Sequence, residues 1–287
     1  MRVNFRVVSL FNRVYWNLVP FFWKLVPSKL GSQRLNFDYS IGIVTYINRY
    51  NIFFKPLIKN LVSIFPDTEF IIAINGYYDQ EKQKKYLKEI IHYLKKFKNV
   101  KLLTFEEPQS LSKLWNLLII NSSNEKVFIL NDDIGISQSF RRHIEKSNIL
   151  KSDVGIINTS WSHFIISKKI VDKIGWFDER FPGVGNEDQD YECRLVFNNI
   201  ALDNFNIGGL KNIVFLTKDF SYGKDTEVVE KKYVKANKIF FDTKWELSDA
   251  ERPGFKYVRL VEKFVRLKPD METPDFYPQF FSRIKNH

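Results

Sequence analysis

Short apolar runs alternate with longer amphipathic segments between residues 39 and 131. The short runs predict strands, and the longer segments, whose apolar residues recur at helical spacing, predict helices. The predicted strands are Tyr39–Thr45, Glu69–Asn75, Val100–Phe105 and Lys126–Asn131, and the predicted helices are Ile52–Ile64, Gln80–Lys98 and Ser110–Asn121. This alternation predicts an α/β fold with a mainly parallel sheet flanked by helices on both faces.

Beyond Asp133 the alternation loosens. Val154–Thr159 and His163–Ser167 predict further strands, and Glu187–Phe197 predicts a helix. The 287 residues are 44% hydrophobic and 16% aromatic, which excludes an intrinsically disordered protein. The single cysteine, Cys193, excludes a disulfide framework and a cysteine-rich zinc site. No uncharged apolar run reaches the roughly 18 residues of a simple membrane-spanning helix.

Both ends of the chain are basic and rich in aromatic or apolar residues. The net charge is +11, and no acidic residue precedes Asp38. We divide the chain into a basic, aromatic arm (1–37), a central domain (38–250) and a C-terminal amphipathic helix and tail (251–287). Aromatic and cationic side chains suit the headgroup region of an anionic membrane, so the arm predicts peripheral membrane contact. Packing on the domain or on a partner subunit is the alternative.

Polar side chains follow three of the predicted strands where each one ends. Ligands of parallel sheets bind beyond the carboxyl ends of the strands, so these side chains are candidate ligand contacts. They are Thr45, Arg49, Asn75, Asn131, Asp132 and Asp133.

The first acidic element is the pair Asp132 and Asp133. Carboxylates held close together repel each other, and a bound divalent cation is the simplest way to stabilise them. Oxygen ligands favour Mg²⁺ or Mn²⁺, which could neutralise a diphosphate. Taken alone, an Asp-Asp pair after a strand also fits an ordinary turn.

The second acidic element is Glu187, Asp188 and Asp190, in the first turn of a predicted helix, where the helix dipole stabilises anions. The preceding segment, 176–185, is aromatic and contains two glycines, which permit close approach. This combination suits a carboxylate base beside a sugar-like ligand that stacks on rings. Stabilisation by the helix dipole alone is the alternative, and Asp190 with Arg194 predicts a structural i,i+4 pair.

In this order the motifs resemble the family 2 glycosyltransferases of the GT-A fold. The specific part is Gly-Trp-Phe-Asp-Glu-Arg-Phe (175–181) followed by Gly-Asn-Glu-Asp-Gln-Asp-Tyr-Glu-Cys-Arg (185–194), and Asn-Asp-Asp (131–133) supports it. The similarity covers roughly Ser40 to Trp245. It implies a Rossmann-like GT-A catalytic domain that transfers a sugar from a nucleotide-diphosphate donor to an acceptor hydroxyl with inversion.

The resemblance also implies roles for individual residues. Asp133 would bind the metal, and Asp188 would be the general base that takes the proton of the acceptor hydroxyl. Glu187 would orient the acceptor or share the proton. The nucleotide-binding residues would be Thr45, Arg49, Asn75, Lys113, Asn131 and Asp132, and the acceptor-binding residues would be Trp176, Gly185 and Glu187.

One departure concerns the metal. Relatives often carry a histidine after the catalytic helix that completes the metal site, and this chain has none between Cys193 and Asn286. Either Asp219 takes its place, or Asp133 and the diphosphate hold the metal alone, or Lys218 or Lys224 acts without a metal. His163, on an apolar strand, is interpreted as structural.

Three other functions fit part of the sequence. A nucleotidyltransferase usually needs a Gly-rich basic signature near the first strand, which 45–49 lacks. A nucleic-acid-binding protein fits the charge, but Glu81 and Glu89 share the lysine-rich helix 80–98, and no binding motif emerges. A catalytically inactive sugar-binding relative is disfavoured because both acidic elements are present.

The sequence therefore predicts an inverting GT-A glycosyltransferase that uses Mn²⁺ or Mg²⁺ and a sugar nucleotide, by default a UDP-sugar. The acceptor would be a hydroxyl of a surface glycan, such as capsule, lipopolysaccharide or O-antigen, or of a lipid-linked precursor. The protein would be cytoplasmic and peripheral on the inner face of the cell membrane, with an anionic membrane surface and no nucleic acid among its partners.

Overall fold

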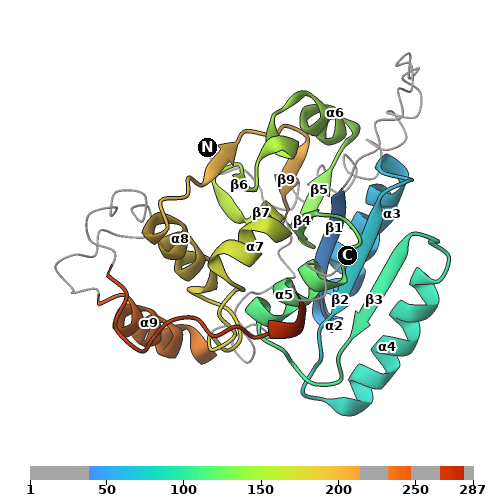
Figure 1. Cartoon of the computed structure of the whole chain (residues 1–287). Helices are drawn as coiled ribbons and strands as arrows, with labels where there is room; N and C mark the ends of the chain where they lie inside the picture. The colour runs from blue at the N-terminus through green and yellow to red at the C-terminus, as the bar shows by residue number, and fades with distance from the viewer. Residues whose placement is uncertain (1–38, 214–231, 247–265, 281–287) are drawn as a thin grey trace, which may run out of the picture.

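The computed structural model describes residues 39–213, 232–246 and 266–280, and its centre is a seven-stranded sheet (Figure 1). The strand order is β3-β2-β1-β4-β7-β6-β8. The strands are β1 (Tyr39–Thr45), β2 (Glu69–Ile74), β3 (Val100–Thr104), β4 (Lys126–Asn131), β6 (Val154–Ile157), β7 (Ser160–Ser167) and β8 (Asp203–Phe205). β1 to β4 are parallel to one another, as the strand–helix alternation predicts. The α/β class is confirmed.

β7 is the exception to the parallel arrangement. It runs antiparallel to both β4 and β6. The two residues between β6 and β7, Asn158 and Thr159, have φ angles of 53° and 62°. Two consecutive positive φ values form the tight turn that joins antiparallel strands of a hairpin. The start of β7 therefore lies beside the carboxyl end of β4, with His163 opposite Leu130.

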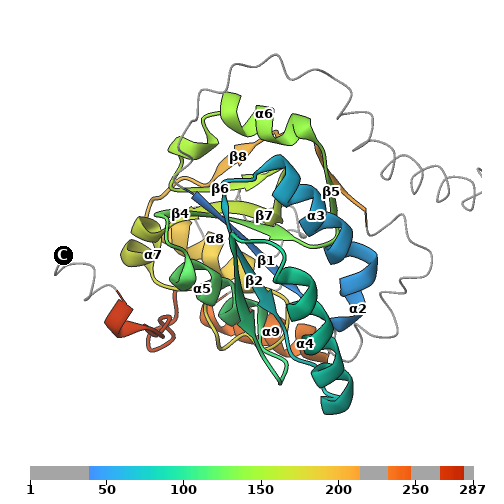
Figure 2. The same cartoon turned by 90° about the vertical axis from the view of Figure 1, so that its right-hand side faces the viewer.

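Helices cover both faces of the sheet. They are α2 (Ile47–Arg49), α3 (Lys55–Ile64), α4 (Gln80–Leu94), α5 (Leu111–Asn121), α6 (Gln138–Lys146), α7 (Lys168–Ile174), α8 (Glu187–Phe197) and α9 (Lys232–Lys244), with a π-helical turn at Tyr50–Phe54 and a 3₁₀ turn at Ile149–Lys151. Figure 2 shows α3 and α4 on one side of the sheet and α5 and α7 on the other. No helix in the described ranges has the length and apolarity that crossing a membrane requires.

Each face of the sheet has its own apolar core. Along β4, Phe128 and Leu130 belong to the core under α3, α4 and α6, while Val127 and Ile129 belong to the core under α5, α7 and α8. Because β4 is buried on both faces, its sequence is a continuous apolar run and does not alternate between apolar and polar residues.

Several predicted boundaries shift, and some elements were not predicted. The helix expected over 80–98 ends at Leu94, and the strand expected over 163–167 begins at Ser160. The pattern did not predict α6, α7, α9 or the small sheet of β5 (Ile134–Ile136) and β9 (Leu210–Asn212). The arm (1–37) lies outside the described residues, as does the predicted C-terminal amphipathic segment except for 266–280.

Candidate active site

The first acidic element is built around a buried arginine. Arg49, at the end of α2, lies directly beyond the carboxyl end of β1, and Asp132 and Asp133 follow β4. Its Nε lies 2.8 Å from Oδ1 of Asp132, and its Nη2 lies 2.7 Å from Oδ2 of Asp133. All three side chains are buried. One guanidinium thus bridges both carboxylates and offsets the repulsion between them.

Electrostatics at this pair favour a further positive charge. Burial raises the pKa of Asp132 to about 6, and Asp133 adds to the increase, while Arg49 and the nearby Thr45 hydroxyl oppose it. Among the described residues, neither Oδ2 of Asp132 nor Oδ1 of Asp133 accepts a hydrogen bond of ordinary geometry, although the Thr45 hydroxyl lies close to Asp132. Buried carboxylate oxygens without partners are costly, so these two oxygens are candidates for binding a cation.

These oxygens fit the ligand preference of Mg²⁺ or Mn²⁺. Asp133, with Asp132 beside it, would hold such an ion. Within the described ranges, no cluster of three or more His, Cys, Asp and Glu side chains is placed to hold a metal by itself. Lys218, Asp219 and Lys224 lie outside those ranges, so the three alternatives for completing the site stay open.

Asn75, another predicted nucleotide contact, is engaged by the backbone of a neighbouring loop. The amide Nδ2 of Asn75 donates to the Gln109 carbonyl at 3.2 Å, and its Oδ1 accepts from the Gln109 N–H at 2.8 Å and the Gly76 N–H at 2.9 Å. Asn75 therefore fixes the loop before α5. At Gly76 an added Cβ would lie 2.1 Å from the Glu107 carbonyl carbon, so only glycine fits there.

Thr45, Asn131 and Lys113 lie at or near the same edge of the sheet. Thr45 is buried at the end of β1, and Asn131, at the end of β4, is opposite Val44 in the sheet. Lys113 lies in the first turn of α5 and is partly exposed. A role for these residues and for Asn75 in nucleotide binding stays a prediction.

The second acidic element begins after a loop of unusual backbone conformation. Gly183, Gly185 and Asn186 have φ angles of 64°, 122° and 70°. Glu187 is buried, and its carboxylate accepts a hydrogen bond from the Gly185 N–H. It therefore folds back onto its own loop.

Asp188 has a different environment from its neighbour. The residue as a whole is partly exposed, but protein atoms surround its carboxylate, whose Oδ1 accepts from the Gln189 N–H at 2.8 Å. Burial of the carboxylate raises the pKa of Asp188, and the charge of Glu192 adds to this, while the Gln189 hydrogen bond opposes it. Perturbed pKa values cluster at functional sites, so Asp188 is a candidate general base.

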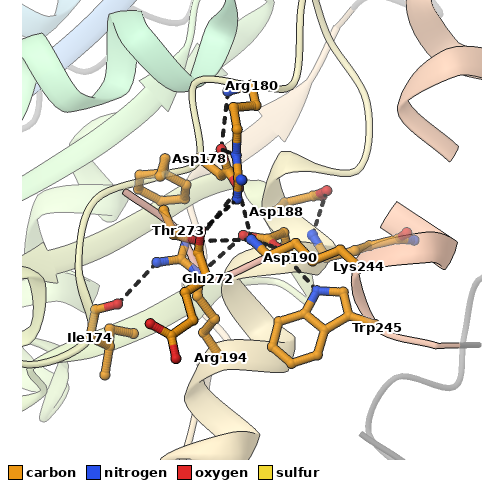
Figure 3. A network of polar contacts seen from close by, with 12 residues as sticks. Ile174, Asp178, Arg180, Asp188, Asp190, Arg194, Lys244, Trp245, Glu272 and Thr273 are labelled. Carbon is orange, nitrogen blue, oxygen red and sulfur yellow. Dashed lines mark hydrogen bonds and ion pairs between the residues drawn. The ribbon is translucent and has the colours of Figure 1, made fainter. Parts of the chain in front are cut away.

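A buried network of ion pairs fixes the start of α8 (Figure 3). Asp190 accepts from Nε of Arg194 at 3.0 Å and from Nε1 of Trp245 at 3.0 Å, and Nζ of Lys244 lies 2.6 Å away. The predicted structural pair of Asp190 and Arg194 is confirmed. Lys244 and Trp245 also belong to the motifs that resemble the family, but the pairing of the fully buried Lys244 with Asp190 was not predicted.

Lys244 also reaches the loop before α8. Its Nζ lies 2.8 Å from Oδ2 of Asp178, which also binds Nη2 of Arg180 at 2.7 Å. Burial opposes ionisation of Asp178, but the hydrogen bonds from Arg180 and the charge of Lys244 outweigh it and lower the pKa of Asp178. One lysine of α9 therefore joins the loop and the helix that carry the second acidic element.

Trp176 lies inside the protein. Its Nε1–H donates to Asp275 at 3.1 Å, and its ring packs edge-on against Tyr277 and Phe280. These contacts favour a packing role. Acceptor binding by Trp176, Gly185 and Glu187 stays a prediction.

Two sets of contacts connect the acidic elements to one edge of the sheet. On β7, His163 is opposite Leu130, which lies near the carboxyl end of β4. Trp161, two residues before His163, donates from its Nε1 to the carboxylate of Glu192 in α8 at 3.1 Å. At the start of α5, the Leu111 N–H donates to the Gly183 carbonyl at 2.8 Å. His163 itself is buried, as a structural residue would be.

The solved structures named below are distant likenesses of this chain. No protein-family model matches the chain, and no curated protein matches it. Similar solved structures are TarS 1–349 from S. aureus in complex with UDP (16% identity, TM-score 0.43, 55% of each chain covered) and the mannosyltransferase PcManGT from Pyrobaculum calidifontis in complex with GDP-Man and Mn²⁺ (9% identity, TM-score 0.45, 71% of this chain and 67% of that one). The chain thus spans about half the length of the TarS fragment. Likenesses this distant do not assign an activity.

The buried ion pairs predict a large cost for removing their shared cation. Lys244→Met leaves Asp178 and Asp190 without that cation, so we expect the free energy of unfolding to fall by about 3–5 kcal/mol. Urea denaturation followed by circular dichroism measures the loss. Lys235→Met, at an exposed position of the same helix, is the control and should change stability by less than about 0.5 kcal/mol. Equal stabilities of the two variants would contradict the role of Lys244.

Proposed function

We propose that the protein is a glycosyltransferase that uses a nucleotide-sugar donor. The observation that carries the proposal is the Arg49-bridged pair Asp132 and Asp133, with two buried carboxylate oxygens lacking partners at the edge where β1, β2 and β4 end. This edge is where α/β sheets of this type bind nucleotides. The motif resemblance to family 2 glycosyltransferases supports the same conclusion.

In this proposal Asp132 and Asp133 hold the donor side of the site. They would hold a divalent cation, which when bound would supply positive charge for the departing nucleoside diphosphate. Arg49 keeps the two carboxylates together when no ion is bound, because a buried pair of like charges is otherwise unstable. Thr45, Asn131 and Lys113, at the same edge, contact the nucleotide.

Asp188 acts on the acceptor. The acceptor hydroxyl attacks the anomeric carbon as Asp188 takes its proton, the bond to the diphosphate breaks, and the configuration at that carbon inverts. Asp188 is partly exposed and has a raised pKa, which supports the choice of Asp188 as the base. Glu187 is buried, and its carboxylate accepts a hydrogen bond from the Gly185 amide. Spacing in the sequence cannot separate two adjacent acids.

The finer assignments rest on the resemblance and on charge. We propose a UDP-sugar donor, a surface-glycan or lipid-linked acceptor, and peripheral attachment through the basic arm to the cytoplasmic face of the membrane. A screen of sugar nucleotides for release of nucleoside diphosphate tests the donor class. Release of pyrophosphate from a nucleoside triphosphate would instead indicate a nucleotidyltransferase.

Removing the proposed base should slow turnover and spare donor binding. We expect Asp188→Asn to lower kcat by at least about a hundredfold, because a general base contributes that much. Donor affinity, measured by calorimetry, should stay within twofold. Asp67→Asn, at an exposed turn, is the matched control. Retained turnover in Asp188→Asn, with loss in Glu187→Gln, would transfer the role to Glu187.

The pH dependence follows from the raised pKa of Asp188. A base must be deprotonated, so kcat/KM should fall as the pH decreases through that pKa. The acid limb should therefore lie above about pH 3.9, the ordinary value for aspartate. Initial rates between pH 4 and 9, in buffers of constant ionic strength, measure it. An acid limb at the ordinary aspartate value would count against Asp188.

Metal binding can be measured without turnover. We expect Asp133→Asn to weaken Mn²⁺ binding by at least about tenfold, since even residues that only support metal ligands contribute that much. Electron paramagnetic resonance of free Mn²⁺, titrated with protein in the absence of donor, gives the affinity. Identical affinities for wild type and Asp133→Asn would remove Asp133 from the metal site.

A further inference from the structure

Asn237 makes an unusual set of contacts from α9. Its side chain is 1% exposed, and its Nδ2 lies within hydrogen-bond distance of three main-chain carbonyls, those of Pro182 (2.9 Å), Val184 (3.3 Å) and Gly185 (3.0 Å). One amide group from a helix some fifty residues downstream thus gathers the carbonyls of the loop before α8.

The loop needs such a donor. Gly183, Gly185 and Asn186 have positive φ angles, and the carbonyls of Pro182, Val184 and Gly185 all lie within reach of the Asn237 amide. The Gly183 carbonyl accepts from the Leu111 N–H instead. Asn237 is buried, and a carbonyl that faces a buried residue and loses its donor is costly. Without the amide of Asn237, the loop would relax toward conformations that solvate these carbonyls.

Asp188 lies between two points that α9 holds. Asn237 binds the carbonyl of Gly185 on one side, and Lys244 and Trp245 bind Asp190 on the other (Figure 3). Among the described residues, the hydrogen bonds to the carboxylate of Asp188 come from the backbone, namely from the Gln189 N–H and its own N–H. Its position is therefore set through the backbone on either side of it.

We propose that Asn237 is a positioning residue for Asp188. The inference rests on the proposed function, since it assigns Asn237 a part in proton transfer from the acceptor. A general base works only within hydrogen-bond reach of the proton that it removes, and a displacement of about 1 Å can cost a hundredfold in rate. Asn237 holds the loop that places Asp188 at that distance.

The substitution Asn237→Ala tests the proposal. We expect kcat for transfer to fall by about ten- to a hundredfold, with KM for the donor and donor affinity within twofold of wild type. The acid limb of the pH profile should move toward the ordinary value of aspartate, because the freed carboxylate becomes more hydrated. Asn198→Ala is the matched control, since within the described residues the Asn198 amide donates to the Arg194 carbonyl at the far end of α8.

Hydrogen exchange gives a readout that needs no activity. In Asn237→Ala we expect faster exchange of the amides of 183–190, and unchanged exchange in β1 and β4. Asn237→Ser, which keeps a shorter donor, should recover part of both effects. Unchanged exchange and turnover in Asn237→Ala would overturn the proposal, as would a loss of donor affinity as large as the loss of kcat.

The two proposals fail in different ways. If the wild-type protein releases no nucleoside diphosphate from any sugar nucleotide, the proposed function fails, and the role of Asn237 in transfer fails with it. If wild type is active and Asn237→Ala matches it in kcat and pH profile, only the positioning role fails.

Discussion

Two adjacent carboxylates, Asp132 and Asp133, are buried at the end of β4, and this arrangement is stable only with a cation between them. Arg49 supplies that cation from the helix that follows β1. Because β1 and β4 are neighbours in the sheet, a contact between residues more than eighty positions apart needs only one short helix. The parallel sheet thus brings the three side chains together. The guanidinium of Arg49 stabilises the two carboxylates in the absence of a ligand.

A second pair of buried carboxylates bridged by one cation lies at the start of α8. Asp178 and Asp190 are buried acids, and Lys244 lies between them as Arg49 lies between Asp132 and Asp133. Replacing either cation would leave carboxylates in a medium that disfavours charge. The two clusters differ in whether their carboxylate oxygens can accept further contacts. In the first cluster, two carboxylate oxygens have no hydrogen-bond partner among the described residues, which suits ligand binding. In the second cluster, Arg194, Lys244 and Trp245 all contact Asp190, which suits a structural role in holding α8.

The sequence predicted the parallel half of the fold well, because β1 and β4 are apolar runs whose ends are marked by polar residues. It did not predict the reversal of β7, since the turn Asn158–Thr159 lacks the glycine that usually signals a hairpin. Candidate site residues close to a strand end, such as Asp133, can be predicted from the sequence. The contacts of Asn237 cannot, because they are made to three backbone carbonyls, and the sequence around Asn237 does not show which backbone groups will face it.

The dependence of α8 on α9 has a consequence for how the protein is made. During synthesis residues 39–213 emerge before α9, and they contain all seven strands of the described sheet together with Arg49, Asp132 and Asp133. Asn237, Lys244 and Trp245 emerge later, so the sheet can form while the loop before α8 still lacks these contacts. A nascent chain would therefore assemble the Arg49-bridged carboxylate pair before α9 could set the backbone around Asp188.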